Sequence, residues 1–264
     1  MMKALLSLII VLTLFSCKKE GLATNPSQVR EFSLASVEKG KSYDIWVRLP
    51  EDYNTTTELY PTIYVLDAKE NQEYVAQTCD EVSKSLNTKN VIVVGIHYGD
   101  NRNVDYTPTS AGMGKGGGPE FMSFIKKELI PHIQKDFRAD LSRNSRVIIG
   151  HSYGGLFGAY AFAKHNEVFG NYLLLSPSMF YDRSIVLQYE QQNRPIIKND
   201  PQLVFIGAGS RETALLPAND LFYQRLADHY PLSKSRFQLV SGKGHTSSRD
   251  TGIENAINFY FKNR

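Results

Sequence analysis

Cysteine is scarce in this sequence, which contains only Cys17 and Cys79 among 264 residues. Two cysteines cannot form the disulfide framework of a small secreted domain, and they cannot supply a cysteine metal site within one chain. If Cys17 is modified, as argued below, Cys79 has no partner. Cys79 falls within a predicted helix, where we expect a half-buried small residue.

An excess of charge of one sign is also missing. The 30 Lys and Arg residues are nearly balanced by 27 Asp and Glu residues, which leaves a net charge of +3. This small and scattered surplus gives no basic patch for nucleic acid. With 42% hydrophobic residues, and with neither an internal repeat nor a mid-chain linker, the sequence is typical of one globular α/β domain.

Long hydrophobic runs are limited to the N-terminus. Lys3 precedes an apolar run over residues 4–15 that is too short for a typical membrane-spanning helix and typical of a signal peptide. Its end, Leu14-Phe15-Ser16-Cys17, resembles a bacterial lipobox, in which the cysteine is acylated and becomes the first residue of the mature protein. The alternative is an ordinary secretory signal in which Cys17 has no role.

The lipobox resemblance divides the chain into three parts. We expect a lipoprotein signal peptide at residues 1–16, a polar tether at 17–28 and the folded domain at 29–264. The protein would then be an exported bacterial lipoprotein of the cell envelope, held at the membrane by a lipid on Cys17.

A phosphate-binding loop is excluded as well. The run Gly114-Lys115-Gly116-Gly117-Gly118 is rich in glycine, but it lacks the Gly-Lys-Ser/Thr ending and does not directly follow a strand. We interpret residues 99–118 as a flexible active-site loop.

What the sequence does contain is a regular alternation of strands and helices. The strand pattern occurs at residues 31–36, 42–50, 62–66, 91–96, 147–149, 171–176, 202–207 and 236–240. The helix pattern occurs at residues 74–86, 120–137, 184–193, 219–229 and 253–261, with a further helix after residue 152 and a bend expected at Pro131. This order predicts an α/β fold with a mostly parallel central sheet of about eight strands flanked by helices.

One stretch organises the rest of the chain. Gly150-His151-Ser152-Tyr153-Gly154 follows an apolar strand and precedes a helix of small residues, which is the context in which Gly-x-Ser-x-Gly is a nucleophile elbow. The sharp turn forces Ser152 into strained backbone angles and exposes its hydroxyl. Gly150 and Gly154 leave room where a Cβ would collide. We therefore predict Ser152 as a catalytic nucleophile.

A serine hydroxyl needs a base, and the base needs an orienting acid. In this fold the chain order is Ser, acid, His, and of the two histidines in suitable positions after Ser152 we favour His245, in the loop after the last strand, over His229. The acid should follow the strand at 202–207, which favours Glu212 and leaves Asp220 as the alternative. An ion pair with Arg211 is the competing interpretation of Glu212.

The oxyanion of the reaction also needs donors. The backbone N–H of Tyr153 is one, and the loop after the strand at 62–66 should supply the other from Ala68 or Lys69. Hydrolases of this fold often carry a His-Gly or Asp-Gly pair in that loop, whereas this sequence has Asp67-Ala68.

Several segments together resemble one family. They are Gly150–Phe157, Phe169-Gly170-Asn171-Tyr172, Leu175-Ser176-Pro177-Ser178, Asp105-Tyr106-Thr107-Pro108, Gly116-Gly117-Gly118 and Glu128-Leu129-Ile130-Pro131. Over about residues 42–261 the chain is similar to the esterase family of α/β-hydrolases that includes esterase D and the ferric-siderophore esterases of the enterobactin and bacillibactin type. Related branches act on feruloyl or acetyl esters of carbohydrate, or on S-formylglutathione.

The resemblance implies roles for specific residues. Ser152 is the nucleophile, His245 the base, and Glu212 lies where many members place the acid, although some siderophore esterases work with little help from one. Residues expected to line the acyl pocket are Tyr106, Thr107, Pro108 and Ser178. Arg102 and Lys115 are placed to meet an anionic substrate.

The expected activity is hydrolysis of carboxylic esters through an acyl-enzyme, without a metal or an organic cofactor. The substrate would be a small-molecule ester, such as a siderophore or a carbohydrate-linked ester. Two alternatives stay open: an acyltransferase that uses the same three residues, and a non-catalytic lipoprotein that uses the pocket to bind a ligand.

Overall fold

Eight strands form one sheet in the order β1-β2-β4-β3-β5-β6-β7-β8. The computed structural model describes residues 28–99 and 101–264, so the predicted signal peptide, Cys17 and all of the tether except its last residue lie outside the described residues. The strands are β1 Val29–Ser36, β2 Lys41–Arg48, β3 Thr62–Val65, β4 Ile92–Ile96, β5 Arg146–His151, β6 Asn171–Leu175, β7 Leu203–Gly209 and β8 Lys234–Val240. β2 pairs antiparallel with β1 and β4, and all other neighbours are parallel, as predicted.

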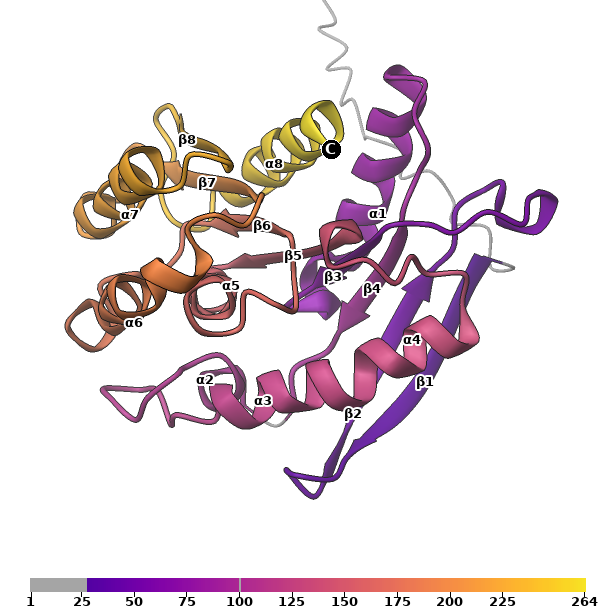
Figure 1. Ribbon diagram of the computed structural model, residues 1–264, viewed down its shortest axis with the longest axis horizontal. Helices are drawn as coiled ribbons and strands as arrows, with labels where there is room; N and C mark the ends of the chain where they lie inside the picture. Colours follow the sequence, from indigo (N-terminus) through magenta and orange to yellow (C-terminus); the bar gives the residue numbers. More distant parts are fainter. Residues whose placement is uncertain (1–27, 100) are drawn as a thin grey trace, which may run out of the picture.

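Helices cover both faces of this sheet (Figure 1). The longer ones are α1 Ala68–Ser85, α5 Tyr153–Lys164, α6 Tyr181–Ile197, α7 Leu216–His229 and α8 Arg249–Asn263, and the shorter ones are α2 Arg102–Asp105, α3 Gly118–Phe124 and α4 Ile130–Asp136. α1 and α8 lie together on one face, and α5 with the run α3–α4 lies on the other. Within the described chain, no helix is long and apolar enough to cross a membrane.

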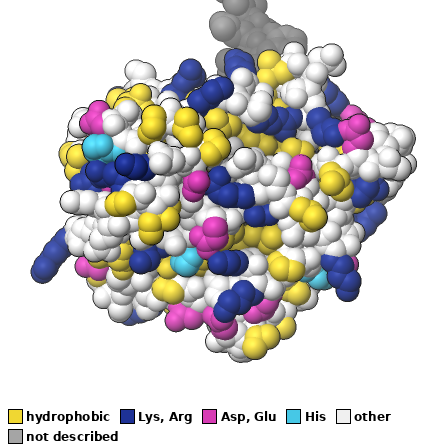
Figure 2. All heavy atoms as spheres, in the orientation of Figure 1, with side chains coloured by type: hydrophobic (Ala, Val, Ile, Leu, Met, Phe, Trp, Pro, Cys, Tyr) yellow, Lys and Arg dark blue, Asp and Glu magenta, His cyan; other side chains and the backbone are white. Residues whose placement is uncertain are grey.

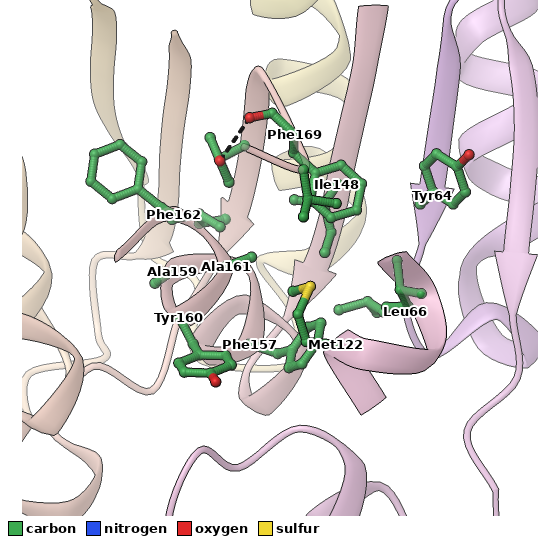
Figure 3. Packing of buried hydrophobic residues seen from close by; sticks show 14 of the residues in the cluster. Tyr64, Leu66, Met122, Ile148, Phe157, Ala159, Tyr160, Ala161, Phe162 and Phe169 are labelled. Atoms are coloured by element: carbon green, nitrogen blue, oxygen red, sulfur yellow. Dashed lines mark hydrogen bonds between the residues drawn. The ribbon is translucent and has the colours of Figure 1, made fainter. Parts of the chain in front are cut away.

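Each central strand contributes alternate side chains to two cores. Ile148 and Leu174 belong to the core under α5, whereas Ile149 and Leu173 belong to the core under α1 and α8. Figure 3 shows side chains from β3, β5, α3 and α5 converging in the first of these cores. Because both faces are covered, the parallel strands are continuously apolar instead of alternating with polar residues.

α1 and the helix predicted at residues 120–137 differ from the sequence expectation. α1 begins at Ala68, six residues before the predicted start, because its first turns are polar and carry no apolar periodicity. The predicted helix at 120–137 is interrupted, as expected near Pro131, but by a π-helical segment, Ile125–Leu129, between α3 and α4. The Ile130 N–H donates to the Ile125 carbonyl, a wider turn that accommodates the proline at the next position.

Candidate active site

The elbow between β5 and α5 has the predicted geometry. Ser152 lies at φ 59° and ψ −116°, a conformation that non-glycine residues rarely adopt. A Cβ on Gly150 would come within 2.5 Å of the Gly154 carbonyl carbon, and one on Gly155 within 2.9 Å of Pro177 Cα. Small residues on either side of the serine are therefore a steric requirement of the turn.

Three predicted residues form one hydrogen-bonded chain. The distance from His245 Nε2 to Ser152 Oγ is 2.9 Å, and that from His245 Nδ1 to Glu212 Oε2 is 2.7 Å. A carboxylate at Nδ1 keeps the proton on that nitrogen, so Nε2 presents its lone pair to the serine hydroxyl. This arrangement can remove the hydroxyl proton as the oxygen attacks a carbonyl.

Glu212 is held as an ionised acceptor below the cleft. Its side chain is 2% exposed, and Oε1 accepts hydrogen bonds from Ser176 Oγ at 2.7 Å, Ser248 Oγ at 3.1 Å and the Gly209 N–H. Burial alone would raise the pKa of this carboxyl, but the donors His245, Gly209 and Ser176 outweigh burial and hold that pKa below its ordinary value.

The alternative acid does not reach the site. Asp220 lies on α7, where its Oδ2 accepts a hydrogen bond from Gln224 at 2.7 Å. The competing interpretation of Glu212 as an ion-pair partner of Arg211 also finds no support, because both carboxylate oxygens bind other groups. Sequence order alone had left this choice open.

Two helix N-termini meet beside the serine. Tyr153 is the first residue of α5 and Ala68 the first residue of α1, so neither N–H has a partner within its helix. The Leu66 N–H donates to the Ile149 carbonyl at 3.0 Å, which aligns the loop after β3 with the end of β5. Of the two predicted donors in that loop, Ala68 follows a residue that lines the cleft, while Lys69 lines a separate cavity beside β2.

His151 is a site residue that the motif did not single out. Its Nε2 lies 2.8 Å from the His245 carbonyl oxygen, so this nitrogen carries a proton and donates it. The two imidazole rings are 4.6 Å apart. Burial lowers the pKa of His151 to about 4, and it is therefore neutral near pH 7. Its place directly before the nucleophile was the signal available in the sequence.

The cleft above these groups has a volume of about 310 Å³ and a polar lining. Its walls are formed by Asp67, Glu70, Asn71, Arg102, His151, Ser152, His245, Thr246 and Arg249. Two carboxylates and two guanidinium groups leave the lining with no dominant charge. The face in Figure 2 likewise shows acidic and basic side chains interspersed. Within residues 28–99 and 101–264, no group of three or more His, Cys, Asp and Glu side chains is arranged to hold a metal ion.

The residues predicted to line an acyl pocket do not line this cleft. Tyr106 and Thr107 are fully buried, Pro108 is buried, and Ser178 is 4% exposed. The Tyr106 hydroxyl accepts a hydrogen bond from the Asp67 N–H, and Thr107 Oγ1 accepts from the Lys115 and Gly116 N–H groups. None of these four side chains is exposed to the cleft, and those of Tyr106 and Thr107 bind backbone groups of Asp67 and of the 99–118 loop instead.

Comparison with known proteins gives consistent results. A family model described as "Putative esterase" matches residues 36–257. The ferri-bacillibactin esterase of Bacillus subtilis is 26% identical over 254 residues, which cover 86% of this chain and 87% of that protein. A siderophore triacetylfusarinine C esterase of Aspergillus fumigatus is 29% identical over 166 residues, or 57% of this chain and 56% of the relative.

The fold is also found among solved structures. A BES protein from Bacillus cereus superposes with a TM-score of 0.78 at 23% identity, and the match covers 97% of this chain and 98% of that one. The predicted α/β-hydrolase fold is thereby confirmed. The family match spans Ser152, Glu212 and His245. This chain belongs to the "Putative esterase" family of α/β-hydrolases and is a carboxylic ester hydrolase.

Proposed function

We propose that this esterase hydrolyses ester bonds within siderophores through an acyl-enzyme on Ser152. The observation that carries the catalytic part is the continuous hydrogen-bonded chain Glu212–His245–Ser152. The siderophore part is supported by relatives named as esterases of ferri-bacillibactin and triacetylfusarinine C.

The geometry supports a two-step reaction. His245 Nε2 takes the hydroxyl proton while Ser152 Oγ attacks the ester carbonyl, and the N–H groups of Tyr153 and Ala68 stabilise the oxyanion. His245 then gives the proton to the leaving alkoxide. In the second step His245 removes a proton from water, which attacks the acyl carbon. His245 then returns this proton to Ser152 Oγ as the acyl bond breaks and the acid is released. Glu212 keeps the imidazole in the required tautomer and stabilises its cationic form.

The substrate is tested by incubating the full chain with ferri-bacillibactin, with triacetylfusarinine C and with p-nitrophenyl acetate, followed by mass spectrometry. We expect each cleaved siderophore ester to gain the mass of one water, and we expect no product with Ser152→Ala. If only p-nitrophenyl acetate were cleaved, the protein would still be an esterase, but the assignment of a siderophore substrate would be contradicted.

We also propose that the protein is anchored in the cell envelope by a lipid on Cys17. The support is the sequence Leu14-Phe15-Ser16-Cys17 behind a charged and then apolar N-terminus. Cys17→Ser should move the protein from the membrane fraction to the soluble fraction of cells that express it, with ester hydrolysis unchanged. Membrane retention of this variant would contradict the anchor.

A further inference from the structure

One ion pair joins the two segments that carry the proposed oxyanion donors. Arg102 in α2 binds the Asp67 carboxylate with Nε and Nη2, both at 2.7 Å, and Nη2 also donates to the His151 carbonyl at 3.3 Å. Asp67 immediately precedes Ala68, and His151 lies two residues before Tyr153. A single guanidinium therefore bonds to the loop after β3 and to the elbow after β5.

Asp67 is held in a conformation that its own chemistry disfavours. It lies at φ 48° and ψ 47°, the left-handed region, which costs a non-glycine residue about 1 kcal/mol or more. Its N–H donates to the Tyr106 hydroxyl at 2.9 Å, and its side chain is 9% exposed. A Cβ on Gly154 would lie 3.2 Å from Asp67 Oδ2, so the carboxylate packs against the first turn of α5. Tyr106 therefore holds the backbone N–H of Asp67, and Arg102 holds its carboxylate.

The conformation of Asp67 sets the direction of the next peptide N–H, which belongs to Ala68. We propose that Arg102 is a positioning residue that, through Asp67 and the His151 carbonyl, fixes the separation and direction of the Ala68 and Tyr153 N–H groups of the oxyanion hole. This inference rests on the proposed function. It gives the 99–118 loop a role in the reaction, because that loop supplies both Arg102 and Tyr106.

A direct contact between Arg102 and an anionic substrate is the competing role. In this structure the two nitrogens of the fork already bind Asp67, whose carboxylate neutralises the guanidinium charge. The rings of Tyr106 and Tyr153 lie 5.5 Å and 5.8 Å from the guanidinium carbon and restrict its movement further. These contacts favour a fixed support over a free cation.

The experiment measures steady-state kinetics on a neutral and an anionic ester, together with the rate of inactivation by a neutral fluorophosphonate. The variants are Arg102→Gln, Arg102→Lys, Asp67→Asn and the double variant Arg102→Gln/Asp67→Asn. Lys135→Gln is the control, because it removes an exposed cation from α4, which does not line the cleft.

We expect kcat on both esters and the inactivation rate to fall by the same factor, about ten- to hundredfold, with KM within about twofold of native. Arg102→Lys should not rescue kcat because an ammonium cannot form the two parallel bonds. The double variant Arg102→Gln/Asp67→Asn should be no slower than Arg102→Gln or Asp67→Asn, because each of the three variants removes the same ion pair. Lys135→Gln should match the native protein.

Asp67→Gly distinguishes a role in positioning the N–H groups from a role in stability alone. Glycine adopts this backbone conformation without strain, so we expect the melting temperature to be kept while kcat falls. A rise in KM confined to the anionic ester, with kcat and the inactivation rate unchanged, would show that Arg102 binds substrate and overturn the inference. Native reactivity retained in every variant would also overturn it. A native protein that does not react would overturn the proposed function as well.

Discussion

The sheet has an amino edge and a carboxyl edge, where the amino ends and the carboxyl ends of its parallel strands meet, and each edge has a cavity. The larger of the two cavities does not contain Ser152. The cavity at the amino ends of the strands has a volume of about 430 Å³, against about 310 Å³ for the cleft at Ser152. Pro61, Leu203 and Tyr260 contribute to the lining of the first, whereas every residue that lines the second is polar or charged. Volume alone would have selected the wrong edge.

Backbone strain separates the edges more clearly. Among the described residues, seven non-glycine residues have positive φ: Asn87 follows α1, three lie at a kink in the first turn of α6, and three follow the carboxyl ends of central strands. The three at strand ends are Asp67 after β3, Ser152 after β5 and Ser176 after β6. Because strain persists only where the surroundings impose it, and is often found at active sites, these three positions support the carboxyl edge as the functional edge of the sheet.

The largest expected effect at the carboxyl edge comes from the base. His245→Ala should lower kcat/KM on p-nitrophenyl acetate by roughly 10⁴-fold or more, because Ser152 then has no group to accept its proton. The melting temperature should change little, since the His245 side chain is 39% exposed. Activity within tenfold of native would mean that the hydrogen bond at 2.9 Å is not used in the reaction.

A smaller loss is expected from the acid. Glu212→Gln keeps the shape of the side chain but removes the charge that stabilises the imidazolium, so kcat should fall by about 10²- to 10⁴-fold. Asp220→Asn is the matched control and should leave kcat unchanged. Equal losses in the two variants would return Asp220 to consideration and break the distinction between the buried acid and the α7 carboxylate.

A third prediction concerns stability and pH. Because His151 has a pKa of about 4 when folded and about 6.5 when unfolded, the unfolded chain binds a proton first as the pH falls. The contribution of His151 protonation to stability is absent above pH 6.5, and it lowers the free energy of unfolding by about 3 kcal/mol by pH 4.

Urea denaturation of His151→Gln tests this contribution of His151 protonation to the free energy of unfolding. The glutamine amide can still donate to the His245 carbonyl but does not titrate. Its free energy of unfolding should therefore decline less than that of the native protein between pH 7 and pH 4, by about 3 kcal/mol. Parallel pH profiles for the two proteins would show that His151 is not kept neutral by the fold.

The smallest effect is expected at the amino edge. Lys234 lines the larger cavity, and Lys234→Gln should leave kcat/KM within about twofold of native on any ester. A loss above tenfold, with the melting temperature unchanged, would mean that this cavity takes part in the reaction, and the contrast between the edges would no longer hold.

The three residues of the hydrogen-bonded chain were largely predictable, because chain order left open only the choice between Glu212 and Asp220. In a parallel sheet the carboxyl ends of neighbouring strands meet at one edge, so the loops after β5, β7 and β8 bring Ser152, Glu212 and His245 together whatever the intervening sequence is. The central strands could also be predicted from the sequence, because burial on both faces requires continuous apolar runs.

The supporting contacts were not predictable in the same way. The Arg102–Asp67 pair joins residues 35 apart and the His151–His245 contact residues 94 apart, and neither is encoded in a local pattern. The side chains of Tyr106 and Thr107 were assigned to the substrate because the resemblance to the esterase family implies an acyl pocket at this loop. In the structure they satisfy backbone groups of that loop and of Asp67 instead.

The most direct test of the account is intact-mass spectrometry after treatment with a fluorophosphonate, which reacts only with a serine activated by a base. The native protein should gain the mass of one phosphonyl group. Ser152→Ala should gain none, and His245→Ala should gain none within the same time. An unmodified native protein, or a native adduct that persists in Ser152→Ala, would contradict the assignment of Ser152 as the activated nucleophile.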